Sequence, residues 1–202
     1  MTEQTTPPAS LDRYVRQVRY RPLGEAGQRR LGDSRVMVCG CGALGSILAN
    51  ILVRAGVGSV RIVDRDVVET VNLQRQTLFS EEDAARASPK AVAAAERLRT
   101  FNSHVEIEPI VANVDRTNVE EFCEGVDAVV DGTDNFETRF LINDAAVKLG
   151  LPWVYGGCLG AEGQTMTILP RQTACLRCLI GDCPPPGSMP TCEMVGILGS
   201  VG

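Results

Sequence analysis

At 202 residues the chain is long enough for one domain with a substantial buried core, and its contents of 44% hydrophobic and 22% charged residues are typical of a globular protein. The 25 acidic and 20 basic residues give a net charge of -5, and aromatic residues make up only 4%, which argues against a nucleic-acid-binding surface. The single histidine, His104, excludes any mechanism that needs two.

The N-terminal residues and the apolar segments indicate a cytoplasmic protein without a membrane segment. Residues 1–13 are polar and contain prolines, and they lack the apolar centre of a signal peptide. The longest apolar stretch, 43–57, is too short to cross a membrane and contains Asn50 and Arg54. In a cytoplasmic domain of this size, the eight cysteines indicate metal or thiol chemistry rather than disulfides.

Hydrophobic periodicity predicts two short N-terminal helices, followed by strands that alternate with helices. The N-terminal helices are expected at 11–21 and 25–31. Strands are expected at 35–39, 60–63, 105–111, 128–130 and 153–155. The helices between them are expected at 44–55, 90–98, 119–123 and 135–149. Because strands that alternate with helices pair in parallel with right-handed crossovers, the sequence predicts an α/β, Rossmann-like fold, a mostly parallel sheet with helices on both faces.

No linker is long enough to divide the chain, so we expect one domain over 1–202. Within it, residues 1–34 form the N-terminal helices and 35–156 the Rossmann-like core. Residues 157–202 form an appended segment, with a strand at 166–169 and then a stretch rich in Cys, Pro and Gly.

A glycine-rich motif follows the first predicted strand. Gly40, Gly42 and Gly45 form a G-x-G-x-x-G that opens the next helix, where backbone N–H groups can receive a phosphate. The alternative is a tight turn without a ligand. Asp64 ends the next strand, where a carboxylate can accept hydrogen bonds from ribose hydroxyls. The glycine motif and Asp64 alone do not distinguish an NAD-dependent oxidoreductase from an enzyme that binds another nucleotide.

Charged and polar residues after the second strand favour a triphosphate ligand. These residues are Asp66, Asn72, Arg75, Gln76 and Lys90. A triphosphate needs cations to neutralise its oxygens, whereas a dehydrogenase needs no such group here. The alternative for Lys90 is a solvated position in a charged loop.

The segment Asp-Gly-Thr-Asp-Asn at 131–135 follows the fourth strand. In an open α/β sheet, ligands bind beyond the carboxyl ends of the strands where the strand order reverses, so we expect Asp134 to face the same crevice as Gly40. There Asp134 could hold Mg²⁺. The alternative is that it only caps the next helix.

Cys175 and Cys178 form a C-x-x-C that we interpret as half of a zinc site, because it lies in a loop rather than at the start of a helix as in a redox pair. Cys192 precedes a predicted helix, where a thiolate could be stabilised, and a structural role is the alternative. Four other cysteines are expected to be small buried residues of the core: Cys39, Cys41, Cys123 and Cys158.

Together these residues resemble the MoeB/ThiF/HesA family of ATP-dependent adenylyltransferases, which activate ubiquitin-like sulfur-carrier proteins and are related to the ubiquitin-activating enzymes. The similar segments occur in the family's order over nearly the whole chain: Arg-Tyr-Val-Arg-Gln at 13–17, the glycine motif, 64–66, 72–76, 89–90, 133–135, 175–178 and 191–192.

The resemblance implies a role for each of these groups. Arg75 and Lys90 bind phosphates, Asp134 serves Mg²⁺, and Arg16 reaches into the site of a neighbouring subunit, which implies a homodimer. Cys192 is an acyl or sulfur-transfer thiol in some members and dispensable in others. The implied nucleotide-binding residues are Gly40, Gly42, Ala43, Gly45, Asp64, Asp66, Asn72, Arg75, Gln76, Lys90, Asp134 and Asn135.

The implied acceptor is the C-terminal glycine carboxylate of a β-grasp carrier that ends in Gly-Gly, in molybdopterin or thiamin biosynthesis, with a sulfurtransferase or cysteine desulfurase as a further partner. That carboxylate attacks the α-phosphorus of ATP and pyrophosphate leaves. Because a carboxylate is already ionised at neutral pH, no general base is needed.

In one respect the sequence departs from the family. The chain ends at residues 199–202, before the family's second C-x-x-C, so we expect a fragment with an incomplete zinc site at Cys175 and Cys178. The alternative is that Cys183 and Cys192 supply the other two ligands. Two other functions stay open, an NAD-dependent oxidoreductase and a non-catalytic binding module with the same fold.

Overall fold

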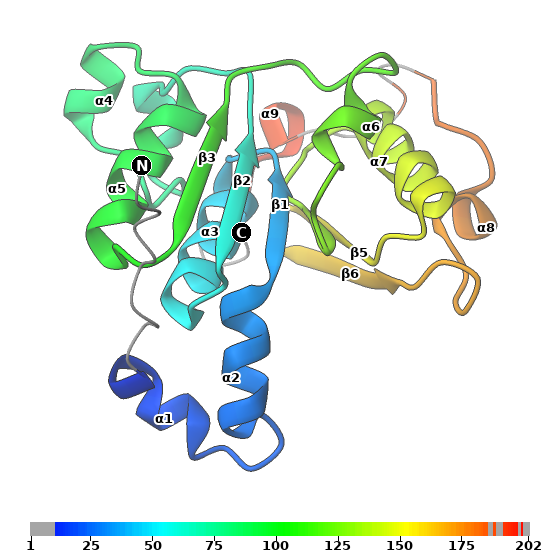
Figure 1. The fold of residues 1–202 in the computed structure, drawn as a ribbon. Helices are drawn as coiled ribbons and strands as arrows, with labels where there is room; N and C mark the ends of the chain where they lie inside the picture. The colour runs from blue at the N-terminus through cyan, green and yellow to red at the C-terminus, as the bar shows by residue number, and fades with distance from the viewer. Residues whose placement is uncertain (1–10, 186–187, 189–191, 198, 200–202) are drawn as a thin grey trace, which may run out of the picture.

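The computed structural model describes residues 11–185, 188, 192–197 and 199, with the side chains of 192 and 193 outside that description. Its centre is a six-stranded sheet in the order β3-β2-β1-β4-β5-β6 (Figure 1). The strands are β1 Arg35–Cys39, β2 Ser59–Val63, β3 Glu106–Ile110, β4 Ala128–Asp131, β5 Trp153–Leu159 and β6 Glu162–Ile168. The first five run parallel, and β6 pairs antiparallel with β5. The predicted α/β fold with a mostly parallel sheet is confirmed.

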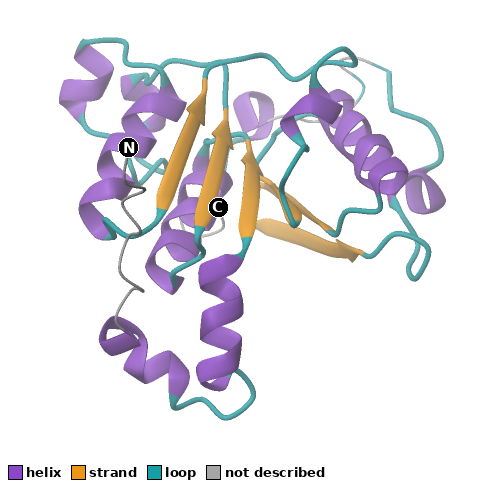
Figure 2. Cartoon of the chain, viewed as in Figure 1, coloured by secondary structure: helices purple, strands orange, loops and turns teal. Residues whose placement is uncertain are grey.

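Helices cover both faces of the sheet (Figure 2). One face carries α3 Ala43–Ala55 and α5 Lys90–Phe101, and the other carries α6 Val119–Phe122 and α7 Phe136–Leu149. The alternating side chains of β1 account for the two cores. Val36 and Val38 pack with α3 and α5, whereas Met37 and Cys39 pack with α7, because neighbouring residues of a strand point to opposite faces.

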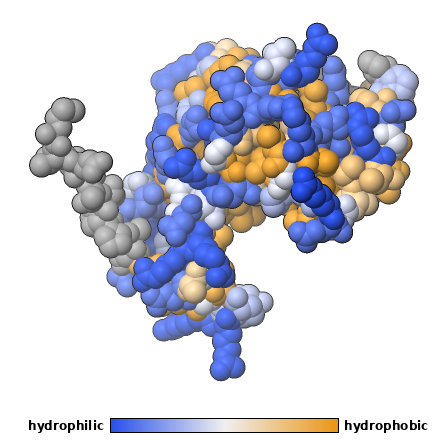
Figure 3. Space-filling model, turned by 45° about the vertical axis from the view of Figure 1, so that its right-hand side comes forward, coloured by the Kyte–Doolittle hydropathy of each residue, from blue (hydrophilic) through white to orange (hydrophobic). Residues whose placement is uncertain are grey.

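The N-terminal segment lies beyond the end of the sheet at which β1 begins (Figure 1). It contains η1 Leu11–Tyr14, α1 Val15–Val18 and α2 Gly24–Asp33. The predicted continuous helix over 11–21 is therefore wrong in extent. The buried Tyr14 interrupts it, since its hydroxyl accepts a hydrogen bond from Nδ2 of Asn102 at 2.7 Å and so fixes the segment against the core. Figure 3 shows that this projecting segment is mainly hydrophilic at its surface.

Several short elements are absent from the sequence prediction. They are η2 Thr70–Asn72, α4 Glu81–Ala85 and α8 Leu176–Ile180. The helix predicted after Cys192 is present as α9 Cys192–Val195, and it begins at that residue. The last strand was expected at 166–169, but β6 covers Glu162–Ile168, and β5 continues past residue 156 to Leu159. Among the described residues, no helix is long and apolar enough to cross a membrane.

Candidate active site

The glycine motif connects β1 to α3, and its three glycines have different reasons to lack a side chain. A Cβ on Gly45 would lie 1.9 Å from the carbonyl oxygen of Gly40, and a Cβ on Gly40 would lie 2.7 Å from that of Gly132. Both positions are therefore required for backbone packing. A Cβ on Gly42 would meet only Nε2 of Gln76, at 3.7 Å. Gly42 also begins α3 without a side-chain cap, which leaves the helix N-terminus open to an anion.

Asp64 connects the end of β2 to this motif. Its Oδ2 accepts a hydrogen bond from the N–H of Cys41 at 2.6 Å, and its Oδ1 accepts one from the N–H of Asp66 at 2.7 Å. Burial raises the pKa of the Asp64 carboxyl, and these two N–H groups oppose that rise. A carboxylate offers about four acceptor positions. Asp64 thus keeps capacity for ribose hydroxyls while it holds the glycine motif.

Lys90 lies beside this loop at the start of α5. Its Nζ is 3.0 Å from Oδ2 of Asp66, and the residue is 5% exposed. The interpretation of Lys90 as a solvated loop residue is therefore wrong. Since Asp66 donates its N–H to Asp64, the contacts run without interruption from the glycine motif to a buried cation.

The end of η2 and the residues after it contribute three more of the predicted residues, Asn72, Arg75 and Gln76. Nη2 of Arg75 donates to Oδ1 of Asn72 at 2.8 Å. Gln76 is 4% exposed, and its Oε1 is a buried oxygen with no hydrogen-bond partner in the structure. An unpartnered buried oxygen beside an open glycine motif fits a site that takes a ligand with a hydrogen-bond donor.

The turn after β4 reaches the same edge of the sheet. The N–H of Gly132 donates to the carbonyl of Cys39 at 2.7 Å, so the turn lies against the glycine motif as expected. Asn135 caps α7, since its Oδ1 accepts from the N–H of Thr138 at 2.8 Å. Asp134 does not cap the helix, and its exposed carboxylate lies 3.4 Å from Nδ2 of Asn135. The capping alternative for Asp134 is therefore wrong, because the N-cap of α7 is Asn135.

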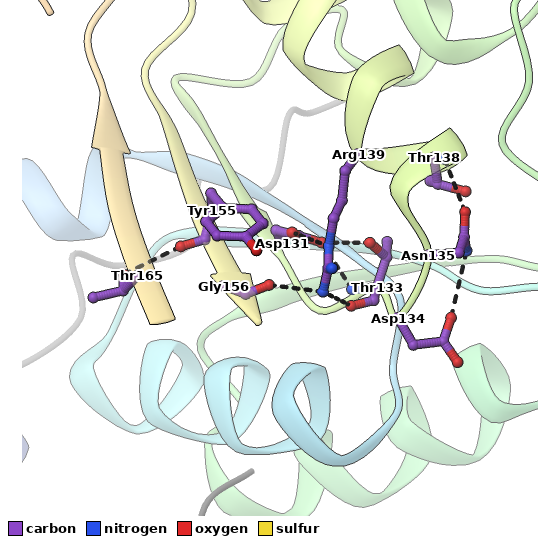
Figure 4. Close-up of polar contacts among 9 residues, drawn as sticks. All are labelled: Asp131, Thr133, Asp134, Asn135, Thr138, Arg139, Tyr155, Gly156 and Thr165. Carbon is purple, nitrogen blue, oxygen red and sulfur yellow. Dashed lines mark hydrogen bonds and ion pairs between the residues drawn. The ribbon is translucent and has the colours of Figure 1, made fainter. Parts of the chain in front are cut away.

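A buried ion pair behind this turn is absent from the sequence prediction (Figure 4). Nε of Arg139 lies 3.2 Å from Oδ2 of Asp131, and the two side chains are 8% and 0% exposed. Burial raises the pKa of the Asp131 carboxyl, and Arg139 and Thr133 counteract that rise. The spacing of Phe136, Arg139 and Phe140 contains the signal, because it places the arginine on the core face of α7.

Arg16 lies outside the group of residues assembled by one chain. It is an exposed residue of α1, and α1 lies beyond the amino ends of the central strands, whereas the glycine motif and Asp134 follow their carboxyl ends (Figure 1). A single chain therefore does not bring Arg16 to the glycine motif.

Residues 14–201 match the model of the ThiF family. The chain belongs to the ThiF family. It is 48% identical over 186 residues to the sulfur carrier protein ThiS adenylyltransferase of Bacillus subtilis, a match that covers 92% of this chain and 55% of that protein. It is 44% identical over 189 residues to the SAMP-activating enzyme E1 of Haloferax volcanii, with coverage of 94% and 69%.

Solved structures of the same fold include ATP complexes. E. coli MccB with ATP matches with a TM-score of 0.76 and 27% identity over 84% of this chain and 52% of MccB. E. coli TcdA, the tRNA N6-threonylcarbamoyladenosine dehydratase, in complex with ATP matches with a TM-score of 0.64 and 28% identity over 71% and 58%. The ThiF-family chain thus spans about half the length of MccB and of the Bacillus relative.

Among the described residues of this ThiF-family chain, the cysteines before the C-x-x-C motif are largely buried. Cys39, Cys41 and Cys123 are buried as predicted, whereas Cys158 is only partly buried. Burial raises the pKa of the Cys123 thiol to about 11, which makes it a poor nucleophile.

Cys175 and Cys178 open a helix, which the sequence interpretation excluded. Cys175 precedes α8, Cys178 lies within it, and their sulfur atoms are 3.7 Å apart. Among the described residues, no three His, Cys, Asp or Glu side chains gather to hold a metal ion. Cys192 begins α9, but its side chain lies outside the described part of the chain.

Proposed function

We propose that this chain activates the C-terminal glycine of a ubiquitin-like sulfur-carrier protein by ATP-dependent adenylation. The observation that carries the proposal is the contact series from Cys41 through Asp64 and Asp66 to Lys90, which sets a buried cation beside the glycine motif. A nicotinamide oxidoreductase has no use for that cation, whereas a triphosphate needs it. Relatives named as a ThiS adenylyltransferase and a SAMP-activating enzyme support the same activity.

In this proposal the carboxylate of the carrier attacks the α-phosphorus in line. The bond from that phosphorus to the bridging oxygen breaks, and pyrophosphate carries away the electron pair. The protein positions the reactants and neutralises charge, with Arg75 and Lys90 directed at the phosphates and Asp64 at the ribose. The side-chain amide of Gln76 lies beside Gly42 at the open N-terminus of α3, where we expect the phosphates to bind.

Asp134 is the residue that we assign to Mg²⁺. Its carboxylate is exposed and contacts only the neighbouring Asn135 side chain among the described residues, so it is free to act as an oxygen ligand, which Mg²⁺ prefers. When bound, the ion supplies charge neutralisation to the phosphates. Asn135 supports the turn on which this carboxylate lies.

We further propose a cytoplasmic homodimer in which Arg16 completes the neighbouring subunit's site, because α1 lies at the opposite end of the sheet from the glycine motif. Cys175 and Cys178 are proposed as two ligands of a structural zinc site that needs two more. Cys192 is a candidate thiol for acyl or sulfur transfer, and a sulfurtransferase or cysteine desulfurase is a candidate partner, in a molybdopterin or thiamin type of pathway.

The deciding experiment is pyrophosphate exchange into ATP. We expect exchange only when ATP, Mg²⁺ and a carrier ending in Gly-Gly are all present, and a carrier that lacks the last glycine is the matched control. Calorimetry should detect ATP binding without the carrier. Tight NAD binding with no ATP binding would overturn the proposal in favour of an oxidoreductase, and ATP binding without exchange by any carrier would favour a non-catalytic module.

A further inference from the structure

We infer that Arg139 is a positioning residue that fixes the turn 132–134, so that Asp134 faces the glycine motif before any ligand binds. The inference rests on the proposed adenylation and deepens it. Arg139 itself does not touch the reacting atoms. It acts through the backbone of the turn.

The contacts of Arg139 join three separate parts of the site edge (Figure 4). Its Nε contacts Oδ2 of Asp131 at the end of β4, at 3.2 Å. Its Nη2 donates to the carbonyl of Thr133 at 2.7 Å and to that of Gly156 in β5 at 3.0 Å. One guanidinium therefore ties the turn to both neighbouring strands.

Asp131 completes the connection from the other side. Its Oδ1 accepts from the N–H of Thr133 at 2.8 Å and from the hydroxyl of Thr133 at 2.7 Å. Thr133 is thus bound through its N–H and hydroxyl by Asp131 and through its carbonyl by Arg139. These three hydrogen bonds hold the backbone immediately before Asp134, and so hold the place from which the Asp134 side chain starts.

The surroundings explain why an arginine is required. The guanidinium carbon lies 5.1 Å from the ring centre of Tyr155 and 5.3 Å from that of Phe136. A planar cation with a fixed fork of donors can contact rings and still reach a carboxylate and two carbonyls, whereas the lysine ammonium is a point charge on a flexible stem. Replacement of Arg139 by lysine should therefore keep the positive charge but lose the simultaneous contacts with one carboxylate and two carbonyls.

The turn lies where its position affects a bound nucleotide. A Cβ on Gly40 would approach the N of Thr133 to 3.0 Å, so the turn and the glycine motif are in direct contact. Asp134 has little support of its own, since its carboxylate lies 3.4 Å from the amide of Asn135. A misplacement of about 1 Å in a reacting geometry can reduce a rate by about 100-fold.

Arg61 provides a matched control outside the site. Its Nε contacts Oε2 of Glu108 at 2.7 Å, and its Nη1 donates to the carbonyls of Phe122 and Glu124 at 2.6 and 3.0 Å. It thus makes one carboxylate and two carbonyl contacts, as Arg139 does. These residues line a hollow of about 470 Å³ that includes none of the residues assigned to the nucleotide.

The experiment compares Arg139→Lys and Arg139→Gln with Arg61→Gln. Mn²⁺ binding in the presence of a non-hydrolysable ATP analogue, measured by electron paramagnetic resonance, should weaken by about tenfold in both Arg139 variants. Hydrogen exchange at the Thr133 amide should accelerate by about tenfold or more. In pyrophosphate exchange, kcat should fall by about 100-fold with a smaller change in the KM for ATP. Arg61→Gln should match the wild type in all three.

Each outcome has a defined meaning. Normal Mn²⁺ binding and normal kcat in a folded Arg139→Lys protein would overturn the inference, as would loss of folding in both Arg139 variants, which would assign the residue to stability alone. A wild-type protein that shows no exchange with any carrier would overturn the proposed function instead. In that case the Mn²⁺ and hydrogen-exchange measurements would still test whether Arg139 fixes the turn.

Discussion

Nζ of Lys90 lies 3.0 Å from Oδ2 of Asp66, with the lysine side chain 7% exposed and the aspartate side chain 54% exposed. A buried ammonium needs a compensating partner, and here the partner is a carboxylate that faces solvent on its other side. A phosphate oxygen that arrives from solvent would therefore share or replace Asp66 as the partner of the same cation.

Lys90→Ala should reduce kcat/KM for pyrophosphate exchange by about 100-fold, because one preorganised charge on the phosphates is lost. Lys148 provides the control, since it is paired with Glu120 and its side chain is 65% exposed. Lys148→Ala should match the wild type. Steady-state exchange kinetics measure both, and a Lys90→Ala protein with wild-type kcat/KM would remove Lys90 from the phosphate site.

Asp134→Ala should abolish adenylation and leave the melting temperature unchanged, because the helix cap is Asn135 and not Asp134. Asn135→Ala should lower stability by about 1 kcal/mol, the usual value of an N-cap. For a chain of this size the melting temperature of Asn135→Ala should fall by about 2–4 °C. Calorimetric melting of both variants is the measurement. An equal fall in the two proteins would show that Asp134 contributes to the cap.

Arg16→Ala should lose activity alone and regain part of it when mixed with Asp134→Ala protein. Because α1 lies beyond the amino ends of the strands, Arg16 cannot reach the glycine motif of its own chain, and the proposed role is in a neighbouring subunit's site. A hybrid dimer then contains one site with both residues intact. Pyrophosphate exchange after mixing, with subunit exchange verified by a mass tag, is the test. Absence of rescue in verified hybrids would exclude a role in trans.

The sequence predicted the features that repeat along the chain and missed those that depend on folding. The continuous apolar run at 36–39 and the glycines that follow predicted β1 and the site edge correctly, because a short apolar run and turn chemistry are local signals. Helix α4 has only five residues, too few for periodicity, although Ser80 and Asp83 form a capping box. Helix α8 is equally short, and its cysteines and the prolines after it favoured a loop.

The Asp131–Arg139 pair was missed for a different reason. Charged residues are buried rarely, so an arginine inside a helix is first interpreted as solvent-exposed. Only the tertiary structure brings the carbonyl of Gly156 and the ring of Tyr155 to the same guanidinium.

Asp144 should make the stability of the chain sensitive to acid. Two hydrogen bonds from Arg177, at 2.7 and 2.6 Å, hold the pKa of the Asp144 carboxyl below its usual value. Because the folded pKa is depressed, this stabilisation is present above the unfolded value of about 3.9 and is lost as the pH falls through the folded value. Asp144→Asn should therefore melt below the wild type at pH 7.

The difference in melting temperature between Asp144→Asn and the wild type should narrow as the pH falls below about 4 and disappear once the pH is below the folded pKa of Asp144. Thermal unfolding from pH 7 to pH 2 measures it. Glu120→Gln, which removes another surface ion-pair partner, is the comparison for general charge effects. A difference that stays constant over the whole range would contradict the assignment to Asp144.

Removal of zinc should leave α8 attached to α7, because the contacts between them do not involve sulfur. Leu176 is 0% exposed, and its N–H donates to Oδ1 of Asn143 at 2.9 Å. Thiolate binding energy is also folding energy, but Cys175 and Cys178 supply only two of the four ligands that a structural zinc needs. We therefore expect weakly held zinc that dialysis against a chelator removes, with hydrogen exchange at the Leu176 amide still slow afterwards. Cys175→Ser, which loses a ligand and keeps these contacts, should behave in the same way.

Two results would contradict this expectation. One zinc per chain that survives dialysis would indicate a complete site, with Cys183 and Cys192 as the candidates for the other two ligands. Fast hydrogen exchange at the Leu176 amide after chelation would mean that the metal holds α8 in place.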